Sequence, residues 1–284
     1  MADDLERLLY HEHLDKRILF QRSREKGGFL SNNLRRKIWP KILNIDKYVP
    51  KVILTTGVGH RDKQQCVCDV ERSFQNVLVS RNTCLTQNVI DNRRAVLDRI
   101  IMSILTQYPA LYYYQGLNDV FSVVILVVED ENTAYLICRA IVLNYLFDFM
   151  QPDFKQVTIL INLIFKVIEE ADKEVYKFLK GAGVEPYFAT SWVLTWLTHD
   201  VKDLNKAART IDSMLCSTPM FSIYLSSAVT IVTYIQYMIQ HRRKAKLLLL
   251  FYSIIDRDSF PQWYSQVCCR PRDCSFLPRY RTSQ

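Results

Sequence analysis

Apolar residues recur along most of this chain at spacings of three and four, which is the period of amphipathic helices. Ser31 is placed to cap a helix over 34–43, whose apolar residues form a single stripe. A second stripe runs through 89–105, and Pro109 ends it because the residue before a proline avoids helical geometry. The segment 117–128 is apolar on nearly every side, which predicts a central, fully buried helix.

The same periodicity covers much of the remaining chain, apart from the stretch 44–63, which is the clearest loop. Further helices are predicted over 3–26, 65–78, 131–148, 153–170, 172–180, 187–200, 203–216, 219–240 and 243–255. Only seven glycines occur, whereas sandwiches, barrels and doubly wound folds need glycine at many tight turns. We therefore predict an all-α, irregular multi-helix domain, and the pattern leaves open whether two lobes divide near 149–152.

The length of 284 residues is sufficient for one large domain with a substantial core. We expect an N-terminal helical extension over 1–29 and the main domain over 30–255. The rest, 256–284, is rich in arginine and carries two prolines, so we expect an irregular basic tail.

The formal net charge of +8 raises the question of a nucleic-acid partner. The basic residues are scattered and do not alternate with aromatic residues, as a stacking surface for single strands would require. Solvated helix faces and a basic tail explain them better, so we expect no nucleic-acid partner. Peripheral contact between the basic surface and an anionic membrane stays open.

Eight cysteines form no pattern that indicates disulfides or zinc, because the Cys66-x-Cys68 pair lacks a second Cys or His unit. The charged N-terminus is unlike a secretory signal, so we expect reduced thiols in a cytoplasmic protein. The adjacent Cys268 and Cys269 could carry palmitate or remain exposed thiols. Phosphate loops and nucleophile elbows are absent from the sequence, which argues against a catalyst with its own nucleophile, metal or cofactor.

Two short segments do carry a recognisable constellation. The first, CVCDVER at 66–72, places Asp69 three residues before Arg72 on a predicted helix. The second, YYQGLND at 113–119, lies where a turn opens the buried helix. In order and spacing the two resemble the Ile-x-x-Asp-x-x-Arg and Tyr-x-Gln-Gly motifs of the TBC-domain GTPase-activating proteins.

Other segments strengthen this resemblance over roughly 30–255. Arg36 and Trp39 match the family's opening Arg-x-x-Trp helix, and PYFATSW at 186–192 is similar to its Pro-x-Phe-Ala-x-x-Trp segment. With LFDFM at 146–150, the chain most resembles the branch called TBC1 domain family member 20. It departs from the family in two places: Cys66 replaces the usual Ile, and the usual Trp-Asp pair reads Ile211-Asp212.

The resemblance implies an activator of a Rab small GTPase in its GTP form, acting in vesicle trafficking between endoplasmic reticulum and Golgi. It assigns the catalytic roles to Arg72 and Gln115, which would act in trans, while GTP and magnesium belong to the Rab. Asp69 would hold the guanidinium, Gly116 would permit a tight turn, and Tyr113 and Asp119 would support the motif. Each residue alone has a simpler interpretation: an Asp-x-x-Arg pair is usually a surface ion pair.

Two alternatives stay open. A TBC-fold module could bind a GTPase or a scaffold partner without accelerating hydrolysis, although inactive relatives commonly lose Arg72 or Gln115. Relatives of the suggested branch carry a C-terminal hydrophobic anchor, and no such segment ends this sequence. We therefore expect a soluble protein with at most peripheral contact at endoplasmic reticulum or early secretory membranes. The pattern indicates neither the Rab nor the oligomeric state.

Overall fold

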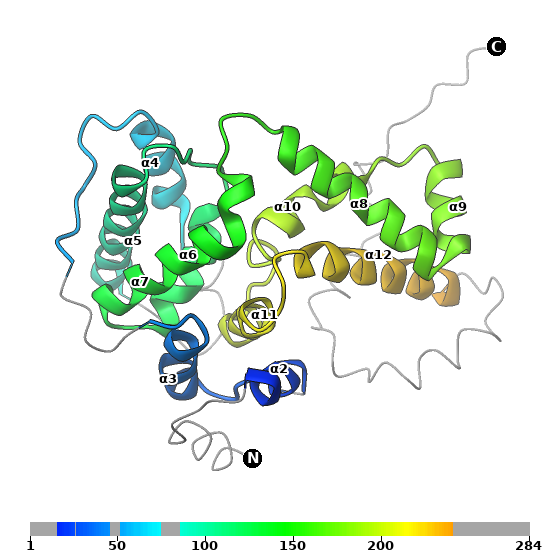
Figure 1. The fold of residues 1–284 in the computed structure, drawn as a ribbon, viewed down its shortest axis with the longest axis horizontal. Helices are drawn as coiled ribbons and strands as arrows, with labels where there is room; N and C mark the ends of the chain where they lie inside the picture. Colours follow the sequence, from blue (N-terminus) through cyan, green and yellow to red (C-terminus); the bar gives the residue numbers. More distant parts are fainter. Residues whose placement is uncertain (1–15, 26, 46–51, 75–85, 241–284) are drawn as a thin grey trace.

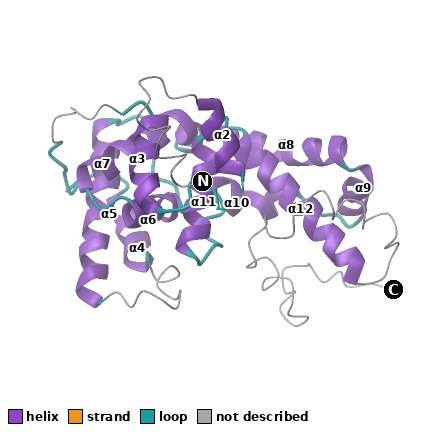
Figure 2. Cartoon of the chain, turned by 90° about the horizontal axis from the view of Figure 1, so that it is seen from below, coloured by secondary structure: helices purple, strands orange, loops and turns teal. Residues whose placement is uncertain are grey.

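The computed structural model describes residues 16–25, 27–45, 52–74 and 86–240. Within these ranges the chain consists of helices and loops and contains no strand (Figure 2). The prediction of an all-α chain is confirmed. The predicted helix over 243–255, the tail over 256–284 and most of the N-terminal extension lie outside the described residues.

The helices follow one another with short connections. The first half contains α2 (Lys16–Arg24), α3 (Asn32–Ile42), α4 (Lys63–Arg72), α5 (Gln87–Gln107), α6 (Leu117–Val127) and α7 (Glu131–Ile141), which continues through the π-helical η2 (Val142–Leu146) and the 3-10 turn η3 (Phe147–Phe149). The second half contains α8 (Lys155–Ala171), α9 (Lys173–Gly181), the 3-10 turn η4 (Pro186–Ala189), α10 (Thr190–Leu194), α11 (Leu204–Leu215) and α12 (Phe221–Gln240).

The helices fall into two groups, with α3 to α7 on one side and α8, α9 and α12 on the other (Figure 1). Helix α12 packs along α8, and α5 contacts α4, α6 and α7. Helices α10 and α11 lie between the groups, where α11 contacts α6. The chain passes from the first group to the second just after η3, close to the division suggested near 149–152.

Several predicted helix ends differ from those of the structure. Ser31 caps α3 as expected, since its hydroxyl accepts a hydrogen bond from the Leu34 amide. The helix predicted over 65–78 ends at Arg72, and the one predicted over 187–200 ends at Leu194. In the second case, Trp196 and Leu197 leave helical geometry and are buried, so tertiary packing overrides the local pattern.

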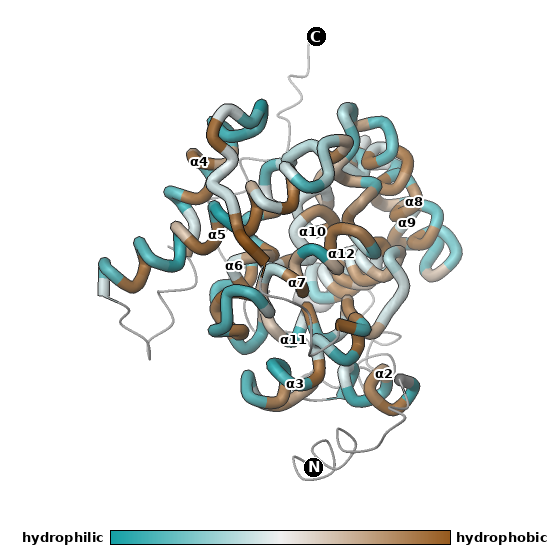
Figure 3. The backbone as a smooth tube through the Cα atoms, turned by 60° about the vertical axis from the view of Figure 1, so that its left-hand side comes forward, coloured by the Kyte–Doolittle hydropathy of each residue, from teal (hydrophilic) through white to brown (hydrophobic). Residues whose placement is uncertain are grey.

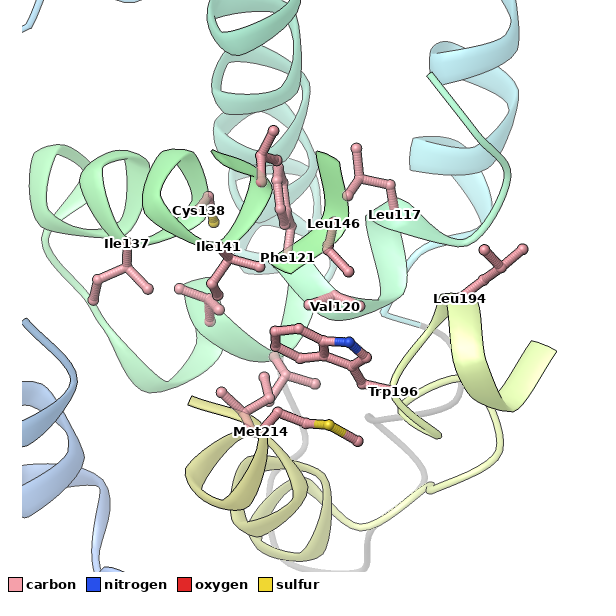
Figure 4. Close-up of a cluster of buried hydrophobic side chains, with 14 of the residues drawn as sticks. Leu117, Val120, Phe121, Ile137, Cys138, Ile141, Leu146, Leu194, Trp196 and Met214 are labelled. Carbon is pink, nitrogen blue, oxygen red and sulfur yellow. The ribbon is translucent and has the colours of Figure 1, made fainter. Parts of the chain in front are cut away.

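Helix α6 forms the centre of the core, as its apolar sequence predicted. Figure 4 shows the indole of Trp196 between Val120 of α6 and Met214 of α11. Apolar segments concentrate in the middle of the molecule, while the outer turns of the helices are hydrophilic (Figure 3). Both positions that depart from the family pattern, Cys66 and Ile211, are fully buried, so these departures change packing.

A buried charge cluster ties the start of the described chain to α11. Asp212 is fully buried and forms an ion pair with Arg35 on α3. It also accepts hydrogen bonds from the Trp39 indole at 2.8 Å and the Phe29 amide at 3.1 Å. These donors compensate the buried carboxylate, which would otherwise be costly in the core.

Candidate functional site

Arg72 is the last residue of α4, and its side chain is 64% exposed. The guanidinium forms an ion pair with Asp69 one turn earlier, and its Nε donates to the Cys68 carbonyl at 3.2 Å. The Asp69 side chain is only 5% exposed, so it provides a fixed anchor. Arg72 is thus held at one edge by its own helix while much of its donor fork faces solvent.

Tyr113 connects this anchor to the second motif. Its hydroxyl donates to the free Asp69 oxygen, Oδ2, at 2.9 Å. Burial, and then the Asp69 charge, raise the pKa of Tyr113 far above its ordinary value, so the phenol stays protonated as a donor. The Tyr113 amide in turn donates to Asp62 at 3.1 Å. Asp69 therefore bridges the two motifs, with one oxygen on each.

Gln115 occupies a tight turn directly before α6. The Leu117 amide donates to the Tyr114 carbonyl at 3.3 Å, and Gly116 has φ 106° and ψ −11°. A positive φ at the third residue is typical of a type II turn, which favours glycine there. A Cβ on Gly116 would also lie 2.7 Å from the Thr195 methyl. The Gln115 side chain at the tip is exposed.

Asn118 is a buried link that the sequence reasoning did not single out. Its Oδ1 accepts the Gly116 amide at 3.2 Å, and its Nδ2 donates to the Ser73 hydroxyl at 3.0 Å. Ser73 directly follows Arg72, so Asn118 joins the end of α4 to the glutamine turn. A polar residue inside an otherwise apolar helix was the available signal.

The contacts between Asp69 and Tyr113, and between Asn118 and Ser73, bring the neighbours of Arg72 and Gln115 together. The two exposed side chains thus emerge from segments that are hydrogen-bonded to each other. The sequence matches the family profile described as Rab-GTPase-TBC domain over residues 32–244. The chain belongs to the Rab-GTPase-TBC domain family.

Curated relatives agree with this assignment. The chain is 30% identical to TBC1 domain family member 20 from Bos taurus over 229 residues, which cover 78% of this chain and 55% of the relative. It is 29% identical to the GTPase-activating protein gyp10 from Schizosaccharomyces pombe over 211 residues, covering 73% of this chain and 55% of the relative. The chain therefore spans about half the length of these relatives. The predicted resemblance to this family and branch is confirmed.

A solved structure supports the fold. The crystal structure of the Chlamydomonas flagellar RabGAP TBC domain superposes with a TM-score of 0.51 at 13% identity. The match covers 94% of this chain and 83% of that one. At this identity the likeness supports the TBC fold alone.

The other predicted residues of this TBC domain lie outside the cluster or at its edge. Trp39 binds Asp212, while Arg36 donates to the Val127 carbonyl at the end of α6 at 2.7 Å. Both positions of the Arg-x-x-Trp motif therefore connect helices. Asp119 lies in the first turn of α6, and its Oδ2 is 2.8 Å from Nδ1 of His199.

The titratable groups of this TBC domain include no activated thiol. Burial raises the pKa of the Cys66 thiol to about 12, with Asp98 nearby adding to the effect. Cysteines 66, 68, 138 and 216 are free. Across the described ranges no group of three His, Cys, Asp or Glu side chains is arranged to hold a metal ion. In the same part of the chain, no helix combines the length and the apolar character that crossing a bilayer requires.

Proposed function

We propose that this TBC domain accelerates GTP hydrolysis on a Rab GTPase in its GTP form, with Arg72 and Gln115 as the catalytic residues. The observation that supports this most is the hydrogen-bonded cluster of Asp69, Tyr113 and Asn118 beneath two exposed side chains. Two relatives, gyp10 and GYP8, are named GTPase-activating proteins, which supports the same activity.

Arg72 stabilises the charge that develops on the transferring phosphoryl group. An inserted arginine contributes about 10³–10⁵ in rate, or roughly 4–7 kcal/mol of barrier. The ion pair with Asp69 and the bond to the Cys68 carbonyl limit the orientations of the guanidinium before the GTPase arrives. Less conformational freedom is then lost in the transition state. The exposed donors of the fork are free to face phosphate oxygens.

Gln115 orients the attacking water in place of the GTPase's own glutamine. The type II turn presents this side chain outward, and Gly116 keeps the backbone compact beside the phosphates. The GTPase supplies GTP and magnesium, so the described residues of this chain need to provide only a positioned charge and a positioned amide.

The cellular setting is part of the proposal. The relatives named TBC1 domain family member 20 suggest the early secretory pathway, with transport between endoplasmic reticulum and Golgi. We propose a cytoplasmic protein whose basic charge permits peripheral contact with anionic membranes. Such contact weakens at high salt, because exposed charges are screened.

Single-turnover GTP hydrolysis on a panel of purified, GTP-loaded Rabs tests the activity. A responsive Rab should lose most stimulation with Arg72→Ala and with Arg72→Lys, because lysine lacks the planar fork. Arg22→Ala is the matched control, since Arg22 forms a similar local ion pair with Glu25 on α2. Near-normal stimulation by folded Arg72→Ala excludes the arginine role.

The second candidate function is a TBC-fold module that binds a GTPase or scaffold without accelerating hydrolysis. The presence of both Arg72 and Gln115 in the cluster favours the activator. Binding measured on the same Rab panel separates the two, because a binding module would retain its partner in the absence of any stimulated phosphate release.

A further inference from the structure

The residues after α10 form one wall of the glutamine turn. The Thr195 methyl lies 2.7 Å from the position that a Cβ on Gly116 would occupy. Four residues later, the His199 amide donates to the Thr195 hydroxyl at 3.4 Å, and its ring reaches Asp119. We call residues 195–200 the α10 turn. It brings His199 to the start of α6 from 80 residues away in sequence.

The backbone of the α10 turn is held in an unusual shape. Trp196 has φ 53° and Leu197 has φ 64°, in the left-handed region that non-glycine residues rarely occupy. Such a conformation costs about 1–2 kcal/mol per residue, so the surrounding structure must enforce it. Both side chains are buried, and Trp196 packs between α6 and α11 (Figure 4). The core thus fixes the α10 turn, which gives His199 a rigid base.

Asp119 transmits this position to the glutamine turn. Its amide donates to the Gly116 carbonyl at 3.1 Å, and its Oδ1 lies 3.4 Å from Nδ2 of Asn118. Its other oxygen, Oδ2, is the one that contacts His199. The carboxylate therefore lies between an imidazole from one segment and the buried amide that links Gly116 to Ser73.

We propose that His199 is a positioning residue for Gln115, because it holds the Asp119 carboxylate and thereby fixes the first turn of α6 and the backbone of the glutamine turn. This inference rests on the proposed function and extends it to a residue outside the family motifs. The contact with the reacting water stays with Gln115. His199 acts only through Asp119.

The charge of His199 follows from its neighbours. Two charged groups act on the ring, Asp119 from α6 and Asp200 from its own turn, and both are acidic. The hydrogen bond to Asp119 raises the pKa of His199, while partial burial opposes this. As pH rises through that raised pKa, the ring loses its charge and holds Asp119 less strongly. Stimulated hydrolysis should then slow.

The first test compares two variants of the full chain on a responsive Rab. Asparagine places an amide near the position of the ring Nδ1 without titrating, so His199→Asn should keep most of the activity and lose the dependence on pH between about pH 6 and about pH 8.5. His199→Ala should lower kcat roughly tenfold and change KM by less than about twofold. Lys166→Ala, which removes an exposed ion pair with Glu169, is the control. Equal loss in both His199 variants overturns the inference.

A double-mutant cycle identifies the residue through which His199 acts. If it positions Gln115, His199→Ala should slow a Gln115→Ala protein no further. If the two losses multiply while the effect disappears in Arg72→Ala, His199 serves the arginine instead and the inference is wrong. A raised KM in every background would make His199 a docking contact, which also overturns it.

Amide hydrogen exchange without any GTPase separates this inference from the proposed function. His199→Ala should speed exchange of the Gly116 and Asp119 amides, which are bonded within this cluster, at least about fivefold. Faster exchange together with no stimulated Rab would support the positioning and refute the activator. Unchanged exchange in a protein that does stimulate a Rab would refute the positioning alone.

Discussion

Tyr113 donates a 2.9 Å hydrogen bond to Asp69 across 44 residues of sequence, and this contact joins the two motifs of the TBC domain. The other oxygen of Asp69 pairs with Arg72. One buried carboxylate therefore orients a side chain from its own helix and accepts a donor from the segment that leads to Gln115. The two motifs need both positions, since neither segment alone fixes the other.

Removing the Tyr113 hydroxyl should loosen Arg72. With Tyr113→Phe, Asp69 loses one donor while staying buried, so we expect a loss of about 1–2 kcal/mol in the free energy of unfolding. Stimulated kcat should fall several-fold with little change in KM, because the interaction positions the arginine for the transition state. Urea denaturation and single-turnover hydrolysis measure the two effects.

Tyr145→Phe provides the control for this prediction. The Tyr145 hydroxyl donates to the Leu215 carbonyl at 2.8 Å, away from the two motifs. We expect a comparable loss of stability and unchanged stimulation. Equal losses of kcat in both variants would mean that Tyr113 contributes only to general stability.

The glycine turn makes a second prediction. Gly116→Ala places a methyl group 2.7 Å from Thr195 on a backbone with φ 106°, so we expect a loss of more than about 1 kcal/mol and of most stimulated hydrolysis. Gly183→Ala separates strain from the clash, because Gly183 has φ 68° and nothing lies near its Cβ position. Thermal unfolding and phosphate release provide the measurements.

A compensating variant identifies the clash directly. Thr195→Ser removes the methyl group and keeps the hydroxyl that donates to Ser191 at 2.8 Å. Added to Gly116→Ala, it should restore part of the lost stability. No recovery would show that strain at Gly116, and not contact with Thr195, accounts for the whole loss.

The fold was largely predictable because helix patterns are local. The Ser31 cap and the buried helix over 117–128 both depend on residues within a few positions, and the structure contains them. Helix ends were less predictable where distant packing decides. The helix expected over 187–200 stops at Leu194 because burial of Trp196 determines the path of the chain.

The site was predictable only as far as the resemblance reached. The pair of Asp69 and Arg72 is local, and the structure contains it. The catalytic assignment of Arg72 and Gln115 stays a prediction. Asn118 and His199 make contacts over 45 and 80 residues, which no spacing rule within a helix contains. A lone histidine in the sequence gives no indication of its partner until the fold places Asp119 beside it.

The buried cluster around Asp212 should serve stability and not catalysis. Asp212→Asn leaves the Arg35 guanidinium buried without its counter-charge, so we expect a loss of about 3–5 kcal/mol. Trp39 and Phe29 also lose a charged acceptor. Asp153→Asn is the control because its partner is exposed, and surface pairs contribute little.

Chemical denaturation measures the stability, and hydrolysis assayed below the transition measures activity. Folded Asp212→Asn should stimulate a responsive Rab normally. A selective fall in kcat without loss of stability would instead connect this cluster to the catalytic residues.

The last prediction concerns Asp200, beside His199. Its Oδ2 is buried without a hydrogen-bond partner, and burial raises the pKa of this carboxyl. A folded pKa above the unfolded value means that the native state holds the proton more tightly. Ionised Asp200 therefore destabilises the fold at neutral pH. This penalty diminishes as pH falls through the raised pKa and disappears below the unfolded value of about 3.9.

Asp200→Asn should accordingly stabilise the protein by about 1 kcal/mol at neutral pH, since an unpaired buried charge is replaced by a neutral amide. The gain should shrink as pH falls, because the wild-type carboxyl then takes up its proton. The same variant should lower the pKa of His199, since one of its two acidic neighbours is lost. Thermal unfolding across pH and histidine titration by NMR measure both effects, with Asp153→Asn as the exposed control. A variant that is less stable at every pH would show that the Asp200 carboxylate has a stabilising partner, and the account of its burial would fail.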